Sequence, residues 1–246
     1  MPGFVLPVRS VPGVIPTRHR VLSFMGDSIT LGFTPPYPFD GTYTYSTGYR
    51  KYVYQNFRQA AYGPIAIGYQ QDSLIFNLDA DIAGDWNAGI LGTTATTWLP
   101  VVPYGGGNYF FGLVKPQMDA QTANPTPDII VFMLGANGGN TSGDATLQLD
   151  MVDILTTTYP LCHVVVCSRT PQTAHASDIV NAALLAGVNT RIAGGAKVLW
   201  FDMFSTITSA ATDIPDGLHP SAAGYQKMGN ALSAQLLTWL TNGTIP

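Results

Sequence analysis

Short apolar runs alternate along the chain with longer segments in which apolar residues recur at helical spacing. Apolar runs of strand length, rich in Val and Ile, are typical of strands buried on both faces of a parallel sheet. They predict strands at residues 21–25, 65–69, 128–134, 163–167 and 197–201. The segments of helical period predict helices at residues 48–61, 144–159, 177–193 and 221–240. Strand and helix therefore alternate from residue 20 onward.

This alternation predicts an α/β fold, a three-layer α/β/α sandwich around one parallel five-stranded sheet, because helical crossovers join parallel neighbours. A flavodoxin-like strand order of 2-1-3-4-5 follows, and it places the first and third strands side by side. The loops after these two strands then open into one crevice, where such sheets carry their chemistry. Residues 68–127 show no clear period, so they are expected to serve function or to contain short elements.

Charged residues are scarce: they make up 11% of the 246 residues, and the net charge is −4. No run of Lys or Arg exceeds the pair Arg50-Lys51, so no basic footprint for nucleic acid is visible. The apolar stretches fall far short of the roughly 20 residues of a membrane span. Cys162 and Cys167 lie on one predicted strand, roughly 16 Å apart at about 3.3 Å per residue. That distance exceeds disulfide reach, and we expect two buried thiols.

Residues 1–19 form a Pro-rich segment ahead of the first predicted strand. It has no uninterrupted apolar core of about 7 to 15 residues, so it does not have the pattern of a signal peptide. We interpret it as an N-terminal arm, either the start of a mature secreted chain or a linker, and residues 20–246 as a single domain. The low charge and the abundant Thr and Tyr favour an extracellular or secreted setting.

A serine follows the first predicted strand, in Gly26-Asp27-Ser28-Ile29-Thr30. A serine hydroxyl becomes a nucleophile only with a positioned base, a group that orients the base, and donors for the developing oxyanion. Of the four histidines, His219 alone lies in a loop after the last predicted strand, with Asp216 three residues before it. On one turn, that carboxylate can fix the imidazole tautomer that accepts the serine proton. Asp27 or Ser28 would also cap a short helix.

Four short blocks, in this order, resemble those of the GDSL-type SGNH hydrolases: residues 26–30, 89–92, 135–137 and 216–220. The resemblance extends from residue 21 to about residue 240. It implies Ser28 as nucleophile, His219 as base and Asp216 as its orienter. It also implies an oxyanion hole made of the Ser28 N–H, the Gly92 N–H and the Asn137 amide.

Two positions depart from the family pattern. Gly89 competes with Gly92 for the glycine of the second block. The third block usually continues with aspartate, whereas this chain has Gly138, so whatever that acid supports is missing or replaced.

The segment Thr47-Gly48-Tyr49-Arg50 is similar to carbohydrate esterases of the acetylxylan-esterase type. The expected activity is hydrolysis of short acyl esters, acetyl above all, on a small molecule or polysaccharide, without metal or cofactor. Predicted substrate contacts are Asp27, Tyr49 and Trp98, although Tyr49 also fits the apolar face of its helix. The oligomeric state stays open.

Other functions use parts of the same pattern. A lipolytic or aryl esterase of broad specificity and an acyltransferase would use the same three catalytic groups. A non-catalytic flavodoxin-like binding module would use the hydroxyl-rich stretch after the first strand to hold a phosphate, but it leaves the Asp216–His219 turn unexplained. The α/β-hydrolase fold is disfavoured because no Gly-x-Ser-x-Gly elbow occurs in the sequence.

Overall fold

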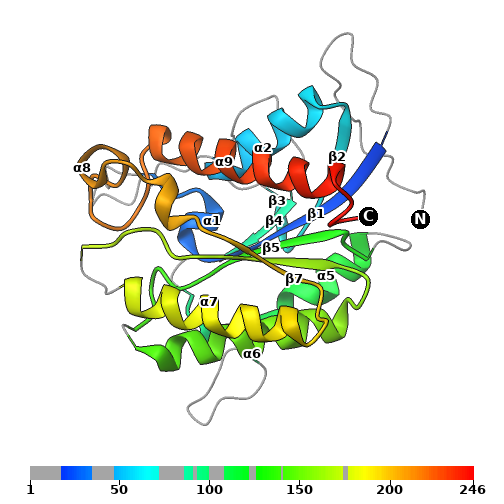
Figure 1. Ribbon diagram of the computed structural model, residues 1–246, viewed down its shortest axis with the longest axis horizontal. Helices are drawn as coiled ribbons and strands as arrows, with labels where there is room; N and C mark the ends of the chain where they lie inside the picture. Colours follow the sequence, from blue (N-terminus) through cyan, green and yellow to red (C-terminus); the bar gives the residue numbers. More distant parts are fainter. Residues whose placement is uncertain are drawn as a thin grey trace.

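Parallel strands form the centre of the molecule (Figure 1). The computed structural model describes residues 18–34, 47–71, 86–90, 93–99, 108–121, 126–139, 141–173 and 177–246. Five of its parallel strands run in the order β2-β1-β5-β6-β7. They are β1 (Arg18–Gly26), β2 (Tyr62–Ile67), β5 (Ile129–Met133), β6 (His163–Cys167) and β7 (Val198–Phe201). This is the predicted order, and the α/β/α fold class is confirmed.

Helices cover both faces of the sheet, as Figure 1 shows. One layer holds α2 (Gly48–Gln59) and α9 (Ala222–Thr241), and the other holds α6 (Ser142–Thr158) and α7 (Ser177–Ala193). Residues of β5 alternate between two apolar cores: Val131 packs with the α2 and α9 side, and Ile130 and Phe132 with the α6 and α7 side. All of β5 is buried, which explains why its sequence is an unbroken apolar run.

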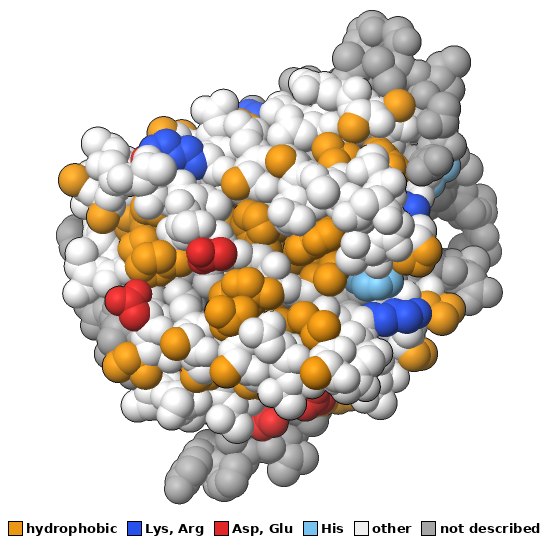
Figure 2. All heavy atoms as spheres, viewed as in Figure 1, with side chains coloured by type: hydrophobic (Ala, Val, Ile, Leu, Met, Phe, Trp, Pro, Cys, Tyr) orange, Lys and Arg blue, Asp and Glu red, His pale blue; other side chains and the backbone are white. Residues whose placement is uncertain are grey.

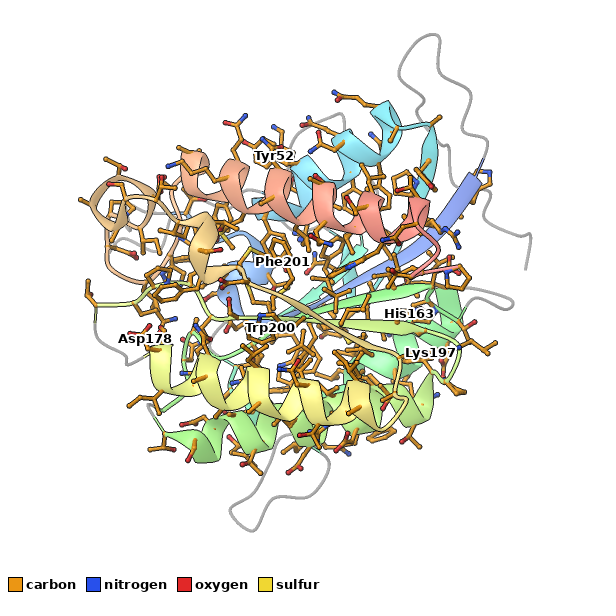
Figure 3. The ribbon with its side chains drawn as sticks, in the orientation of Figure 1. Tyr52, His163, Asp178, Lys197, Trp200 and Phe201 are labelled. Carbon is orange, nitrogen blue, oxygen red and sulfur yellow. The ribbon has the colours of Figure 1, made fainter. Side chains whose placement is uncertain are left out.

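Among the strands of the described residues, the last strand, β7, pairs only with β6 and forms one edge of the sheet. Its side chains alternate in the same way: Phe201 points toward α9 and Trp200 toward α7 (Figure 3). Apolar side chains gather on the surface over this edge, in the band between α9 and α7 (Figure 2). The two helix layers therefore meet across an edge strand that is only partly covered.

The segment without a clear period contains several short elements. Strand β4 (Trp86–Gly89) pairs parallel with the end of β1, and β3 (Gln70–Gln71) pairs antiparallel with β4. The other elements are α4 (Ala95–Trp98), the π-helix η2 (Phe110–Val114) and α5 (Lys115–Gln121). Elements this short show no period in the sequence, and the prediction of five strands therefore omitted β3 and β4.

The boundaries of β2 and β1 differ from the predicted ones. Strand β2 begins at Tyr62, opposite Arg18 of β1, and includes Pro64. A proline, which has no N–H to donate, is tolerated there because β2 pairs with β1 alone in the described part of the chain and lies at an edge of the sheet. Strand β1 takes in Arg18 and His19 from the predicted arm, while residues 1–17 lie outside the described part of the chain.

Two short helices connect β7 to α9, and both cysteines are buried. The chain reaches α9 through the 3-10 helix η3 (Phe204–Thr206) and the short helix α8 (Ala210–Asp213). Cys162 and Cys167 are free and buried, as predicted. Within the described ranges, none of the helices combines the length and the apolar character needed to cross a membrane.

Candidate active site

The ends of β1 and β5 bring two of the predicted blocks together. Gly26 pairs with Met133 at the last register position of these neighbouring strands. The chain that leaves β1 begins α1 (Ser28–Leu31) at once, and the chain that leaves β5 forms the turn of residues 134–139. Ser28 and Asn137 therefore share one edge of the sheet, the position at which open α/β sheets bind ligands.

Ser28 is the first residue of α1, and Asp27 is its N-cap. The Oδ1 atom of Asp27 accepts the Ile29 N–H at 3.0 Å, so the predicted cap is confirmed. The first N–H groups of a helix have no partner within the helix, and they point toward the helix start. The N–H of Ser28 belongs to this set, which makes it suitable as a donor to an anion.

A chain of hydrogen bonds joins Ser28, His219 and Asp216. The Oγ atom of Ser28 lies 2.9 Å from Nε2 of His219. The other ring nitrogen, Nδ1, lies 3.0 Å from Oδ2 of Asp216. The structure thus brings together the three predicted residues, although Ser28 and His219 are 191 positions apart.

The turn before α9 sets the position of His219. Oδ1 of Asp216 accepts the N–H groups of Leu218 at 2.9 Å and His219 at 2.7 Å. Gly217, directly after Asp216, has a φ of 79°, a left-handed conformation that suits glycine. One carboxylate therefore shapes the turn with one oxygen and contacts the imidazole with the other.

The imidazole also packs against Phe33. The two ring centroids are 4.8 Å apart and the rings are inclined by 56°. The Tyr225 hydroxyl donates to the Phe33 carbonyl at 2.7 Å, which ties the start of α9 to the chain that follows α1. Ser28 is 1% exposed and His219 7% exposed, so their hydrogen bond lies in a nearly dry environment.

Asp27 connects α1 to the turn of residues 134–139. Its Oδ2 accepts the N–H groups of Gly135 at 2.9 Å and Ala136 at 2.7 Å. Burial raises the pKa of Asp27, and the backbone N–H bonds act in the opposite direction. The prediction of Asp27 as a substrate contact does not fit this position, because both of its oxygens are used by backbone donors and it is 1% exposed.

The remaining predicted oxyanion donors have different outcomes. The Asn137 amide lies on the same turn, and its Nδ2 donates to the Thr93 carbonyl at 3.2 Å. The Gly89 N–H donates to Oδ1 of Asn87 at 2.8 Å, so this competitor of Gly92 already has a partner. Gly89 also packs directly under α1, since a Cβ there would lie 2.3 Å from the Leu31 nitrogen. Gly92 lies outside the described residues.

Tyr49 and Trp98 are both core residues, each with 0% exposure. The Tyr49 hydroxyl pairs with Oγ1 of Thr30 at 3.1 Å, and its ring meets Phe24 edge-on. The Trp98 indole N–H donates to Oγ1 of Thr93 at 3.1 Å. These positions do not fit the predicted substrate contacts, because fully buried rings have no surface for a ligand. Tyr49 instead lies on the buried apolar face of its helix, which was the alternative interpretation from the sequence.

Arg50 is a site residue that the sequence analysis did not identify as one. It is 0% exposed, and it donates from Nε to the Thr30 carbonyl at 2.8 Å and from Nη2 to the Leu31 carbonyl at 3.1 Å. A cation at the C-terminal end of a helix satisfies its free carbonyls. Arg50 thus holds the far end of α1, while Asp27 holds its start.

Gly138, the second departure from the family pattern, lies against Arg169. A Cβ at Gly138 would be 2.7 Å from Nη2 of that arginine.

Among the residues that the structure describes, no group of three or more His, Cys, Asp or Glu side chains could hold a metal ion.

Comparisons with known proteins agree with this geometry. Residues 24–227 match the sequence profile of the GDSL-like Lipase/Acylhydrolase family. The multidomain esterase of Ruminococcus flavefaciens is 26% identical over 231 residues, which cover 88% of this chain but only 28% of the curated relative. The family 3 carbohydrate esterase of Talaromyces cellulolyticus superposes with a TM-score of 0.68 at 19% identity, over 91% of this chain and 99% of that one. A mutant of an acetyl esterase, solved with an acetate ion, superposes with a TM-score of 0.67 at 19% identity, over 91% of this chain and 99% of that one.

Proposed function

The chain belongs to the GDSL-like lipase/acylhydrolase family and is an ester hydrolase, and from this premise we propose that it removes short acyl groups, acetyl above all, from a carbohydrate. Ser28 is the nucleophile, His219 the general base and Asp216 its orienter. The observation that carries the proposal is the unbroken series of hydrogen bonds from Ser28 Oγ through the His219 ring to Asp216.

In the first half of the reaction, Ser28 Oγ attacks the ester carbonyl carbon while Nε2 of His219 takes the hydroxyl proton. The carbonyl oxygen becomes an oxyanion, which accepts hydrogen bonds from the Ser28 N–H and the Asn137 amide. The proposed third donor is the Gly92 N–H, at a position outside the described residues. The C–O bond to the sugar then breaks, and His219 returns the proton to the leaving hydroxyl, which leaves an acyl-serine.

Water completes the cycle. His219 takes a proton from the water as its oxygen attacks the acyl-serine carbonyl, and the second tetrahedral oxyanion occupies the same donors. The bond to Ser28 Oγ breaks, His219 returns the proton to the serine, and the carboxylic acid leaves. Asp216 stays ionised throughout and stabilises the imidazolium that forms in each half.

The proposed substrate rests on two lines of support. The names of similar proteins include a carbohydrate esterase and an acetyl esterase solved with acetate. The His219 ring also packs against Phe33 and is nearly buried, which favours a small acyl group. We further infer that residues 20–246 act as one catalytic domain, since strand β1 and helix α9, from opposite ends of the chain, share one apolar core. The proposed setting outside the cell rests on the low charge and the abundant Thr and Tyr of the sequence.

Ester hydrolysis across acyl lengths tests the proposal. Wild type should release acetate from p-nitrophenyl acetate and from acetylated xylan faster than it cleaves medium-chain esters. Ser28→Ala should remove the activity and the labelling by an organophosphonate probe, whereas the control Ser209→Ala, at an exposed position, should retain both. Activity that survives in Ser28→Ala contradicts the nucleophile, and a preference for medium-chain esters contradicts the acyl group.

A further inference from the structure

Two buried charged side chains bond to different ends of the turn of residues 134–139. Asp27 accepts N–H groups at the start of the turn. Arg169, which follows β6 and is 2% exposed, donates to the end of the turn. Neither side chain is needed to close the turn itself, because the Gly138 N–H already donates to the Gly135 carbonyl at 3.2 Å.

The guanidinium of Arg169 bonds to the end of the turn and to a neighbouring helix. Its Nη1 donates to the Gly139 carbonyl at 2.7 Å. In the amide orientation that satisfies both of its ends, Gln148 accepts from Nη2 of Arg169 at 3.3 Å and donates to the Leu134 carbonyl at 2.7 Å. Arg169 and Gln148 together therefore bind both ends of the turn that carries Asn137.

Two glycines let the guanidinium approach the turn. A Cβ at Gly135 would lie 2.3 Å from Nε of Arg169, and a Cβ at Gly138 would lie 2.7 Å from Nη2. Gly135 also has a φ of 121°. The backbone on either side of Asn137 thus rests directly on the cation, with no side chain between them.

The charges around Arg169 match this arrangement. Burial lowers the pKa of Arg169, and the carboxylates of Asp144 and Asp27 oppose that effect. Asp144 also accepts the Gly139 N–H at 3.0 Å, so carboxylate and guanidinium bind the two polar groups of the same residue. An arginine keeps its charge under such conditions, because its guanidinium holds its proton strongly.

The space next to Arg169 is small. Together with Asp27 and Ala136, the side chains of Arg169, Thr170 and Gln172 line a cavity with room for about one water molecule. The bonds of the guanidinium described above all go to protein groups, which favours a role in holding the turn.

We propose that Arg169 is a positioning residue that holds the Asn137 turn in place, so that its amide and the Ser28 N–H face one oxyanion. This inference rests on the proposed function of Ser28 and Asn137. Asp27 ties the start of the turn to α1, and Arg169 holds the end of the turn at the Gly139 carbonyl. Oxyanion donors are effective only when they are fixed before the reaction, and a displacement of about 1 Å costs on the order of 10²-fold in rate.

Gly138→Ala is the most informative variant. The added methyl group meets the tip of a flexible side chain, so the guanidinium must shift while the charge and the fold are kept. Gly112→Ala is the matched control, because a Cβ there has nothing within 4 Å. Arg169→Met removes the guanidinium altogether, and its control is Arg191→Met, which removes an arginine paired with Asp153 on α6 instead.

The readouts are kcat, KM, the melting temperature and the inhibition constant of methylboronic acid, whose tetrahedral serine adduct places an oxygen where the oxyanion forms. We expect kcat to fall about 10-fold in Gly138→Ala and about 10²-fold in Arg169→Met, with boronate affinity falling in parallel and KM changing little. Both controls should keep wild-type kcat and boronate affinity.

Three results decide between the inference and its alternatives. If both variants lower only the melting temperature, with kcat and boronate affinity intact, Arg169 is merely structural and the inference is overturned. If KM rises while boronate affinity is unchanged, Arg169 acts on substrate binding, which also overturns it. Activity in Ser28→Ala is a separate failure, since it contradicts the proposed function itself.

Discussion

Asp216→Asn tests the proposed mechanism sharply, because the structure determines how the new amide must lie. Oδ1 of Asp216 accepts two N–H groups, from Leu218 at 2.9 Å and from His219 at 2.7 Å. The oxygen of an asparagine must take this place, since an NH2 group there would face two donors. Its NH2 group then faces Nδ1 of His219, where a carboxylate oxygen now lies at 3.0 Å.

A donor opposite Nδ1 makes that nitrogen the acceptor and leaves the ring proton on Nε2. Nε2 is the atom 2.9 Å from Ser28 Oγ, and in this tautomer it donates to the hydroxyl when it should accept its proton. The corresponding substitution in serine proteases costs about 10⁴ in kcat, roughly 5.5 kcal/mol of transition-state stabilisation. We expect Asp216→Asn to lose kcat on this scale, with little change in KM.

The assay is steady-state hydrolysis of p-nitrophenyl acetate, with thermal unfolding of each variant measured beside it. Asp213→Asn is the matched control: this buried aspartate, three residues earlier, bonds to the Thr208 and Ser209 N–H groups and to Lys227. It should lose stability and keep kcat within about threefold. A kcat for Asp216→Asn within tenfold of wild type would refute the argument that Asp216 sets the tautomer.

Three further outcomes follow from the same contacts. Asn137→Ala should lower kcat by a factor of about 10² to 10³, which is roughly 3 to 4 kcal/mol of transition-state stabilisation, and leave KM unchanged. A loss of kcat below fivefold in steady-state kinetics would contradict the role of Asn137 as an oxyanion donor. The bonds from Lys227 and from backbone N–H groups lower the pKa of Asp213, whereas burial acts in the opposite direction. The stability that these bonds contribute is present at pH values above the ordinary pKa of an aspartate. It is lost as the pH falls through the lowered pKa of Asp213. Asp213→Asn should therefore lower the unfolding free energy by about 2 kcal/mol at neutral pH and by less at about pH 2, so an equal loss in thermal melts at both pH values contradicts the assignment. Arg50→Met should leave the Thr30 and Leu31 carbonyls buried without this donor and lower the free energy of unfolding in urea by about 2 to 4 kcal/mol. Arg50→Lys should recover part of that loss. Equal stability of Arg50→Met and wild type excludes the role of Arg50 at the end of α1.

Some of the site was predictable because it depends on local pattern and on topology. The apolar runs that became β1 and β5 are strands by their length and burial, and parallel crossovers make them neighbours. Once they are neighbours, Ser28 and Asn137 must follow adjacent strand ends. Asp216 and His219 are three residues apart, so one turn is enough to bring the carboxylate to the ring.

The positions of Asp27, Tyr49 and Trp98 could not be predicted in this way. An aspartate beside a serine has the same local sequence whether it contacts a ligand or, as here, two backbone N–H groups more than one hundred positions away. An aromatic ring near the serine block is equally compatible with the crevice and with the core. The choice depends on which long-range neighbours cover the side chain, and here they cover Tyr49 and Trp98 completely.

The sequence by itself determined the order of the five predicted parallel strands, which follows from periodicity, and the short spacing of Asp216 and His219. The resemblance of four short blocks to a known family then implied which residues meet at the strand ends. The tertiary structure alone decided which donors near Ser28 are already used, as with the Gly89 N–H, and which buried cations support the site, as with Arg50 and Arg169. Those outcomes depend on contacts between distant segments, whose energies come from close packing and from the satisfaction of buried polar groups. Neither quantity has a period in the sequence.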